Sequence, residues 1–185
     1  MKKALIEDAS IELLELFDEV SKEAKIEKNA GLLINRIHYW WTRKPLIVGR
    51  AMALASTLDN IEDVKLLLGL DKKNRAYTYI PDNAIFAKKL GMSPKEIKVL
   101  DPFGGGGNLI YASSEMGLDC HSSDYNPVAY LIQKAILEYP NKINDKLFST
   151  IQKTGEKIIL KTKEELNEFF LDENLMYYWS KCIVC

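Results

Sequence analysis

Residues 101–107 (Asp-Pro-Phe-Gly-Gly-Gly-Gly) end in four consecutive glycines. Of all segments of the sequence, this one has the residue types best suited to a chemical role. The mainly apolar residues 97–100 (Ile-Lys-Val-Leu) before it predict a short strand, and the residues from Asn108 onward predict a helix. Because glycine has no side chain, a run of glycines lets the backbone turn sharply and lets another group approach it closely. We therefore predict a ligand-binding loop between the carboxyl end of a strand and the start of a helix.

Two better-known glycine motifs do not fit this loop. The dinucleotide-binding fingerprint needs a third glycine three positions after its second one, but Leu109 and Ile110 occupy the positions where that glycine would fall. A phosphate-binding loop needs Lys followed by Ser or Thr, and Asn108 and Leu109 stand there instead. The loop therefore belongs to another class of ligand-binding motif.

An acid follows the loop at a spacing that suits a nucleoside. Residues 117–124 predict a second short strand that ends in Asp124, with Tyr125 next to it. Asn126 and Pro127 then predict a helix start, because asparagine is a good N-cap and proline fits the first helical position. In a doubly wound sheet, an acid at the end of the second strand accepts hydrogen bonds from ribose hydroxyls. Taken alone, such an acid is more often a cap or a solvated loop residue, but its place after the glycine loop favours a ligand.

A basic and aromatic segment, residues 38–45 (His-Tyr-Trp-Trp-Thr-Arg-Lys-Pro), is the third signal. Residues 28–58 contain five Lys or Arg and no Asp or Glu, whereas residues 1–27 contain eight acids and four lysines. The segment is suited to contact phosphates, to stack on a base or to hold an anionic group of a ligand. The alternative is that Trp40 and Trp41 pack in the core beside a basic turn.

The loop resembles the S-adenosylmethionine loop of amino-methyltransferases that act on DNA, whose pattern is Asp-Pro-Phe-x-Gly-x-Gly. Gly105 and Gly107 fall on its two glycines. Together with the segment 38–45 and a predicted helix over 46–58, the loop resembles the N-terminal part of the adenine-specific DNA methylases that carry a zinc ribbon. This resemblance covers about residues 32–140.

The resemblance implies S-adenosyl-L-methionine as the cofactor. It implies that Asp124 binds the adenosyl ribose and that Tyr125 lines the adenine. Asp101 and the backbone around Gly105 are then expected to face the methionine part, and the helix start after Gly107 suits the methionine carboxylate.

In many amino-methyltransferases with permuted motif order, the segment before the glycine loop folds over the methionine end of the cofactor. By resemblance, His38, Thr42 and Arg43 are candidates for that contact, and Arg43 is suited to pair with a carboxylate in a fork geometry. The complete set of candidate cofactor-binding residues is His38, Thr42, Arg43, Asp101, Pro102, Phe103, Gly104, Gly105, Gly107, Asp124 and Tyr125.

The last four residues, Cys182-Ile183-Val184-Cys185, have the spacing of a zinc knuckle. A closed zinc site needs two such pairs, and only one is present, so we expect no zinc site within these residues. By resemblance, Cys182 and Cys185 are the first half of a zinc ribbon, and zinc is expected only in a longer protein.

One absence bears on catalysis. Amino-methyltransferases of this kind hold the target amino group with Asp, Asn or Ser followed by Pro-Pro and an aromatic residue, but the six prolines of this chain are all isolated. We therefore assign no catalytic residue and expect cofactor binding without methyl transfer by this chain alone. The leading hypothesis is the cofactor-binding part of a DNA adenine-N6 methyltransferase. The alternatives are part of an RNA methyltransferase, a non-catalytic cofactor-binding subunit that needs a partner chain, and a nicotinamide-binding oxidoreductase, for which the third glycine is missing.

Length and composition are compatible with all of these hypotheses and do not distinguish between them. A chain of 185 residues, 47% of them apolar, can bury close to about 70% of its unfolded surface. The net charge of −1 does not favour nucleic acid, so DNA contact would depend on the local basic segment or on further polypeptide. No long apolar run and no signal peptide are found, which predicts a cytoplasmic protein, and three cysteines do not suggest a disulfide framework.

For the fold we predict the α/β class: a partial Rossmann-like methyltransferase core with helices before and after two parallel strands. Its expected parts are an acidic N-terminal helix (1–28), the cofactor-binding part (29–140) and a helical extension (141–185). Two strands do not form a stable sheet alone, so we expect the N-terminal part of a longer protein or a split enzyme, with an exposed sheet edge. Apolar periodicity predicts helices over 4–25, 46–58, 61–70, a segment ending at 90, 145–158 and 163–170.

Overall fold

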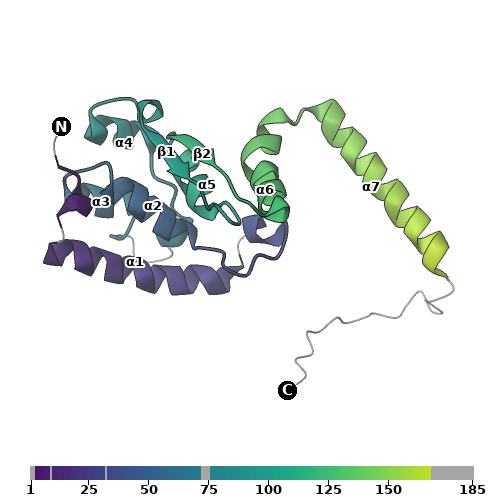
Figure 1. Ribbon diagram of the computed structural model, residues 1–185, viewed down its shortest axis with the longest axis horizontal. Coiled ribbons are helices and arrows are strands. Elements are labelled where there is room, and N and C mark those ends of the chain that lie inside the picture. The colour runs from purple at the N-terminus through teal and green to yellow at the C-terminus, as the bar shows by residue number, and fades with distance from the viewer. Residues whose placement is uncertain (1–2, 9, 32, 72–75, 168–185) are drawn as a thin grey trace, which may run out of the picture. The chain divides into compact units, whose positions relative to one another are not determined.

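The computed structural model describes residues 3–8, 10–31, 33–71 and 76–167 (Figure 1). The chain divides into two compact units, residues 1–141 and residues 142–185. The first unit holds both strands and the glycine loop, and the described part of the second holds one long helix, α7 (Asp145–Leu166).

A small parallel sheet of two strands, β1 (Lys98–Asp101) and β2 (Asp119–Ser122), lies in the first unit. Leu100 lies opposite His121 in the register, and α5 (Asn108–Glu115) connects the strands. A strand, a helix and a parallel strand among further helices confirm the mixed α/β class predicted from the sequence.

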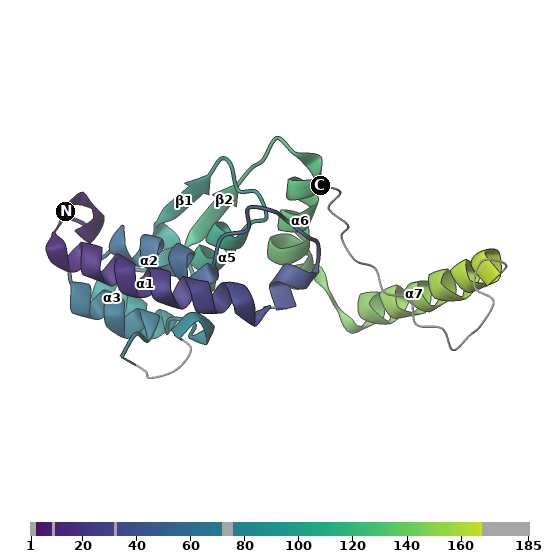
Figure 2. The ribbon, with the colours of Figure 1, turned by 90° about the horizontal axis from the view of Figure 1, so that it is seen from below.

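Helices make up the rest of the first unit (Figure 2). Side chains of Ser10, Asn60 and Asp82 cap the starts of three of them by accepting backbone N–H groups, and left-handed glycines end the same three. The helices before the sheet are η1 (Leu5–Glu7), α1 (Ile11–Ala30), η2 (Leu33–Arg36), α2 (Leu46–Ala55), α3 (Ile61–Leu68), η3 (Ala76–Thr78), α4 (Asn83–Leu90) and η4 (Pro94–Glu96), and those after it are α6 (Pro127–Gln133), the π-helix η5 (Lys134–Glu138) and η6 (Tyr139–Lys142).

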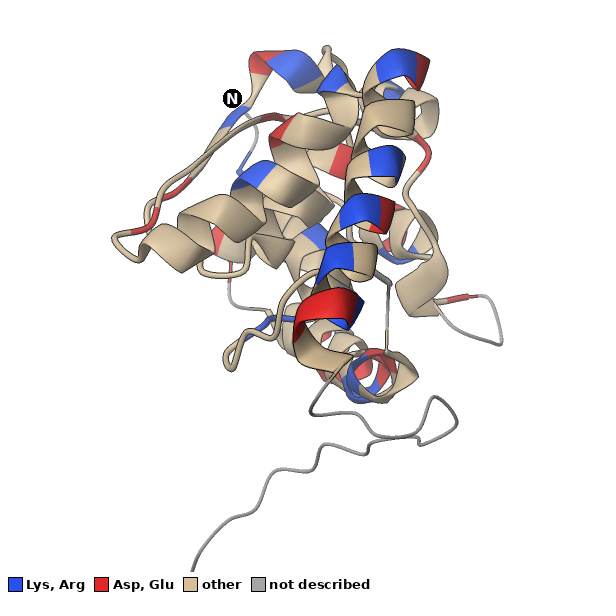
Figure 3. Ribbon diagram, turned by 90° about the vertical axis from the view of Figure 1, so that its right-hand side faces the viewer, with Lys and Arg blue, Asp and Glu red and all other residues tan. Residues whose placement is uncertain are grey.

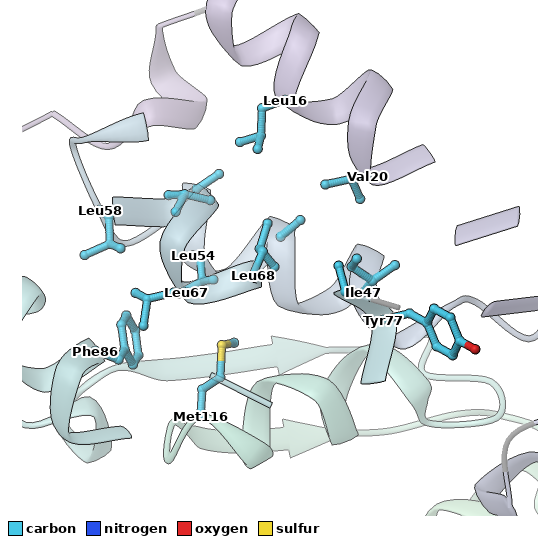
Figure 4. Close-up of a cluster of buried hydrophobic side chains, with 14 of the residues drawn as sticks. Leu16, Val20, Ile47, Leu54, Leu58, Leu67, Leu68, Tyr77, Phe86 and Met116 are labelled. Carbon is cyan, nitrogen blue, oxygen red and sulfur yellow. The ribbon is translucent and has the colours of Figure 1, made fainter. Parts of the chain in front are cut away.

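The hydrophobic core lies between α1, α2 and α3 and continues to the sheet through α4 and the end of α5 (Figure 4). Leu16 of α1, Leu54 of α2, Leu67 of α3 and Phe86 of α4 are almost completely buried. Met116, just after α5, packs into the same cluster. This core fixes α2 and α5 relative to each other, and those two helices carry the segments that form the candidate site.

The helix predicted over residues 4–25 begins later and ends later than expected. Residues 5–7 form η1, and α1 starts at Ile11 because the Ser10 hydroxyl accepts the N–H of Leu13. The helix then continues to Ala30, since no residue with a strong preference against helix precedes Gly31. The predicted cap at Asn126 is confirmed, because its side chain accepts the N–H of Val128 at 2.9 Å.

Residues 145–158 and 163–170 were expected to form two helices, but α7 is continuous from Asp145 to Leu166. Nothing between Ile158 and Lys163 removes a backbone N–H or favours a turn, so the helix continues. Residues 168–170 lie outside the described part. All the described side chains of α7 are at least partly exposed, and charged residues of both signs are spread along the helices in Figure 3.

None of the helices in the described ranges is long and apolar enough to cross a membrane.

A buried ion pair joins α2 to α5. The Arg50 guanidinium donates to Oε2 of Glu115 from Nε at 3.1 Å and from Nη2 at 2.6 Å, and its Nη1 donates to the carbonyl of Tyr77 at 2.8 Å. The two charged side chains are 3% and 12% exposed. Burying two charges is costly unless both are paired, so these two side chains stabilise the fold only while they stay together.

We predict that Arg50→Met lowers the free energy of unfolding by about 3–5 kcal/mol, because Glu115 is then left buried without its partner. Adding Glu115→Leu to Arg50→Met should restore much of that loss. The measurement is chemical denaturation of the single and double variants. Lys22→Met, which breaks an exposed pair with Asp18, is the control and should change the free energy by less than about 1 kcal/mol. A double variant less stable than either single variant would contradict this account.

Candidate functional site

The glycine loop and the acid after β2 meet at the carboxyl end of the sheet. The N–H of Gly105 donates to Oδ2 of Asp124 at 2.8 Å, although the two residues are 19 positions apart. The other carboxylate oxygen of Asp124 accepts the N–H of Asn126 at 2.8 Å. The two features that the sequence predicted to share one ligand are therefore in direct contact.

Backbone hydrogen bonds hold the start of the loop against the end of β2. The carbonyl of Asp101 accepts the N–H of Ser123 at 3.0 Å, and the N–H of Gly104 donates to the carbonyl of Ser123 at 2.9 Å. The Asp101 carboxylate accepts the N–H of Phe103 at 3.1 Å, which fixes the turn after β1. The loop is thus ordered by contacts within the chain.

Close packing accounts for the glycines in the loop. A Cβ on Gly104 would collide with the hydroxyl of Ser122, and one on Gly105 would lie 2.9 Å from the indole nitrogen of Trp40. Gly105 and Gly107 also have positive φ angles of 51° and 77°, which other residues rarely adopt. The sequence predicted that a ligand needs this closeness, but here side chains of the protein itself already require it.

The basic and aromatic segment lies against the loop. Trp40 packs on the loop, and the guanidinium of Arg43 donates from Nη1 to Oδ1 of Asn108 at 3.2 Å and from Nη2 to the carbonyl of His38 at 2.7 Å. Nδ2 of Asn108 donates back to the carbonyl of Lys44 at 2.8 Å. Burial lowers the pKa of Arg43. Arg43 therefore holds the segment to the start of α5, where the sequence predicted a contact with a ligand carboxylate.

A buried carboxylate fixes the end of the same segment. Glu27, near the end of α1, is 2% exposed and accepts the N–H groups of Leu46 at 2.6 Å and Ile47 at 3.0 Å. These are first-turn amides of α2, which have no partner within the helix. Burial raises the pKa of the Glu27 carboxyl, and the two amides oppose that rise. Glu27 thereby sets where α2 begins and where the segment before it runs.

A cleft of about 130 Å³ lies between the segment and the loop. Its walls include predicted residues from both sides: Thr42, Arg43, Asp101, Phe103, Gly104 and Gly105. The rest of its lining is Trp40, Lys44, Gly106, Asn108 and Leu109. Phe103 is 88% exposed and stands at the rim.

The other predicted residues lie outside this lining. Gly107 is the N-cap of α5, and Asp124 is joined to the cleft through Gly105. Tyr125 is fully exposed beside Asp124, and Pro102 is exposed in the loop. His38 is exposed, and its backbone carbonyl accepts a hydrogen bond from Arg43 of the cleft.

Two polar residues that sequence reasoning missed, Gln133 and Asn108, hold the site together. Nε2 of Gln133 on α6 donates to the carbonyl of Gly105 at 3.0 Å, and this side chain is 4% exposed. The place of Asn108, directly after the glycines at a helix start, was a signal for a structural role. Gln133 gave no signal, because only the path of α6 brings it to the loop.

A metal centre finds no support among the described residues. Cys182 and Cys185 lie outside them, and within them no cluster of three His, Cys, Asp or Glu is placed to hold a metal ion. Burial raises the pKa of the Cys120 thiol to about 11, which keeps it protonated at neutral pH.

Residues 17–78 match the model of a family described as a protein of unknown function (DUF1156). The match covers most of α1, the basic and aromatic segment, α2 and α3, and it ends before the glycine loop. No curated protein and no solved structure matches the chain. The similarity concerns the helices that position the loop and brings no activity with it.

We predict that Gly104→Ala lowers the free energy of unfolding by about 1–3 kcal/mol, because the new methyl group overlaps Ser122 and Gln133. Gly155→Ala is the matched control, since Gly155 lies in α7 with open space around it and alanine favours helix by about 1 kcal/mol. Denaturation followed by tryptophan fluorescence measures both. Equal stability of Gly104→Ala and the wild type would contradict this prediction, because it would show that the loop can move to accept the methyl group without loss of free energy.

Proposed function

We propose that this chain binds S-adenosyl-L-methionine at the carboxyl ends of β1 and β2 and is the cofactor-binding part of a methyltransferase that acts on adenine N6 in DNA. Under this proposal the chain has part of a Rossmann-like methyltransferase fold. The proposal starts from the resemblance of the glycine loop to that of amino-methyltransferases. The observation that carries it is the contact between Gly105 and Asp124, because it joins the loop and the acid in one site.

The residues at this site fit the adenosyl part of the cofactor. The Asp124 carboxylate accepts one backbone N–H on each oxygen, and each oxygen can accept a further hydrogen bond from a ribose hydroxyl. Tyr125 is fully exposed next to it and offers an aromatic face to the adenine.

The cleft fits the methionine part and no more. Sites for small ligands usually measure about 300–1,000 Å³, and this cleft measures about 130 Å³. In the proposed arrangement the methionine part enters between Thr42 and Asp101, and the adenosyl part lies outside, over the strand ends. The start of α5 has a glycine N-cap with no capping side chain, so its N–H groups suit the carboxylate of the ligand.

The cofactor supplies a methyl group that is already activated on a sulfonium. What this chain contributes is binding and orientation, since a transfer enzyme must also hold the acceptor amino group in line with the methyl group. The sequence has no Pro-Pro-aromatic tetrapeptide for that task. Transfer is therefore proposed to need another polypeptide segment or a partner chain.

A groove beside β1 supports the addition of that segment to the sheet. It measures about 540 Å³ and is lined by β1, by α5 and by residues of α2 that include Met52 and Ala53. The axes of packed helices lie about 8–10 Å apart, whereas neighbouring strands lie about 4.8 Å apart. One helix therefore covers about two strands, so α5 alone is nearly wide enough to cover β1 and β2. Because α2 packs beside α5, the helix layer extends past β1.

Side chains alternate between the two faces of a strand, so Leu100 points to the face opposite the core-packed Val99, and it is 70% exposed there. Parallel sheets are normally covered on both faces, and unpaired strand edges invite pairing. The bare face at Leu100 and the edge of β1 that pairs with no strand in the described part of the chain therefore favour further polypeptide here.

The missing tetrapeptide equally favours a second candidate, a cofactor-binding subunit without catalysis of its own. RNA in place of DNA remains the alternative substrate. Ligand binding tests the shared part of these proposals, and methyl transfer separates them.

We predict that S-adenosylhomocysteine binds the wild type and that Asp124→Asn weakens it by about 10-fold or more, because charged acceptors contribute about 1.5–3 kcal/mol per hydrogen bond. Calorimetric titration is the measurement. Asp119→Asn is the matched control, since Asp119 is the first residue of β2, at the end of the strand away from Asp124, and its substitution should leave the affinity unchanged. NAD is not expected to bind. Tight binding of NAD, or undiminished affinity in Asp124→Asn, would reject the proposed site.

We also predict that the chain alone transfers no labelled methyl group from S-adenosylmethionine to DNA or RNA while it binds the cofactor. Scintillation counting of the recovered nucleic acid measures this. Transfer to DNA at the rate of a complete enzyme would contradict the need for a further segment. Transfer to RNA but not to DNA would contradict that need as well, and it would replace the DNA proposal by its alternative.

A further inference from the structure

We infer that Gln133 is a positioning residue that aims the N–H of Gly106 into the cleft as a donor to the amino-acid part of the ligand. This inference rests on the proposed function. Gln133 itself does not line the cleft, and it would act only through the loop backbone.

Gln133 fills the inner side of the loop. Its side chain comes from α6 and is 4% exposed, and Nε2 donates to the carbonyl of Gly105 at 3.0 Å. Its atoms occupy the space that a Cβ would need at Gly104 and at Gly107, the first and last glycines of the run. Nε2 of Gln133 would lie 2.8 Å from a Cβ on Gly104, and its Cγ would lie 3.0 Å from a Cβ on Gly107. The Gln133 side chain therefore packs against both ends of the glycine run.

The direction of one peptide follows from this bond. In a trans peptide the C=O of one residue and the N–H of the next point in opposite directions. Because Gln133 holds the carbonyl of Gly105, the N–H of Gly106 points away from Gln133. Gly106 is buried and lines the cleft, which lies between the loop and residues 40–44.

The N–H of Gly106 donates no hydrogen bond within the described part of the chain. The flanking amides differ, since Gly105 donates to Asp124 and Gly107 donates to the carbonyl of Gly104. Buried backbone N–H groups almost always have a partner, so an unpaired one that faces a cleft indicates a ligand acceptor. A carboxylate suits it best, because α5 starts two residues later and its N-terminus favours an anion.

Without Gln133 the glycine peptide has no fixed direction. Glycine adopts positive and negative φ about equally well, so the peptide between Gly105 and Gly106 can turn when its carbonyl is released. The amide of Gly106 would then no longer be held toward the cleft. The adenosyl contacts of Asp124 do not include this peptide, so only the amino-acid part of the ligand should lose affinity.

Two probes separate the two ends of the ligand: S-adenosylhomocysteine, and 5′-methylthioadenosine, which lacks the amino-acid part. For Gln133→Leu we expect calorimetry to show about a 10-fold loss for S-adenosylhomocysteine, the size of one hydrogen bond to a charged group, and less than about a 2-fold change for 5′-methylthioadenosine. Gln152→Leu, the same change at an exposed position of α7, is the control and should alter neither affinity.

Gln133→Glu gives a readout that a merely structural role would not produce. The ionised carboxylate repels the carbonyl of Gly105, whereas the protonated carboxyl donates to it as the amide does. The affinity of this variant for S-adenosylhomocysteine, relative to the wild type at the same pH, should therefore recover as the pH falls. Circular dichroism on each sample verifies that the variants are folded.

Equal loss of both probes in Gln133→Leu, or a Gln133→Glu variant whose relative affinity does not depend on pH, would overturn the role of Gln133 and leave the proposed function intact. Failure of both probes to bind the wild type would overturn the proposed function and this inference together. Selective loss of S-adenosylhomocysteine with recovery at low pH would establish the inference.

Discussion

The contact between α2 and α5 is the constraint on which the rest of the first unit depends. Arg50 and Glu115 meet there in the core, and their charges leave little tolerance for any other packing of the two helices. The basic and aromatic segment leads into α2 and the glycine loop leads into α5. Asn108 and Arg43 then join these two segments directly, so the walls of the cleft are set by how two buried helices pack.

The glycine loop serves the fold before it serves any ligand. Ser122, Gln133 and Trp40 occupy the space that side chains on the glycines would need. Backbone hydrogen bonds with Ser123 also hold the loop against the end of β2, and Gly106 lines the cleft. Packing and binding therefore select the same residue type, and a glycine run alone does not tell them apart. The two roles are distinguished by which backbone N–H groups of the loop have a hydrogen-bond partner within the protein.

Much of the local structure could be predicted from the sequence because it depends on neighbours. The cap at Asn126, the helix start after the glycines and both short strands were predicted from such signals. α1 starts later than predicted because Ser10 caps it, and α7 is continuous because no residue within it breaks the helix. The cleft was predicted only in part. Arg43 was predicted to contact a ligand, and it does line the cleft. Its hydrogen bonds to Asn108 and to nearby carbonyl oxygens were not predicted, because the fold arranges those acceptors.

By itself the sequence determined which chemical groups are present: a run of glycines that permits a sharp backbone turn, an acid at or just after the end of each strand, and a concentrated basic segment. Those properties belong to residue types and short spacings, which act over a few positions along the chain. Only the tertiary structure decided that Trp40 closes the loop, that Gln133 holds the carbonyl of Gly105 and that Asp124 accepts its N–H. These contacts join residues from 19 to 65 positions apart, and their geometry exists only once the helices have packed.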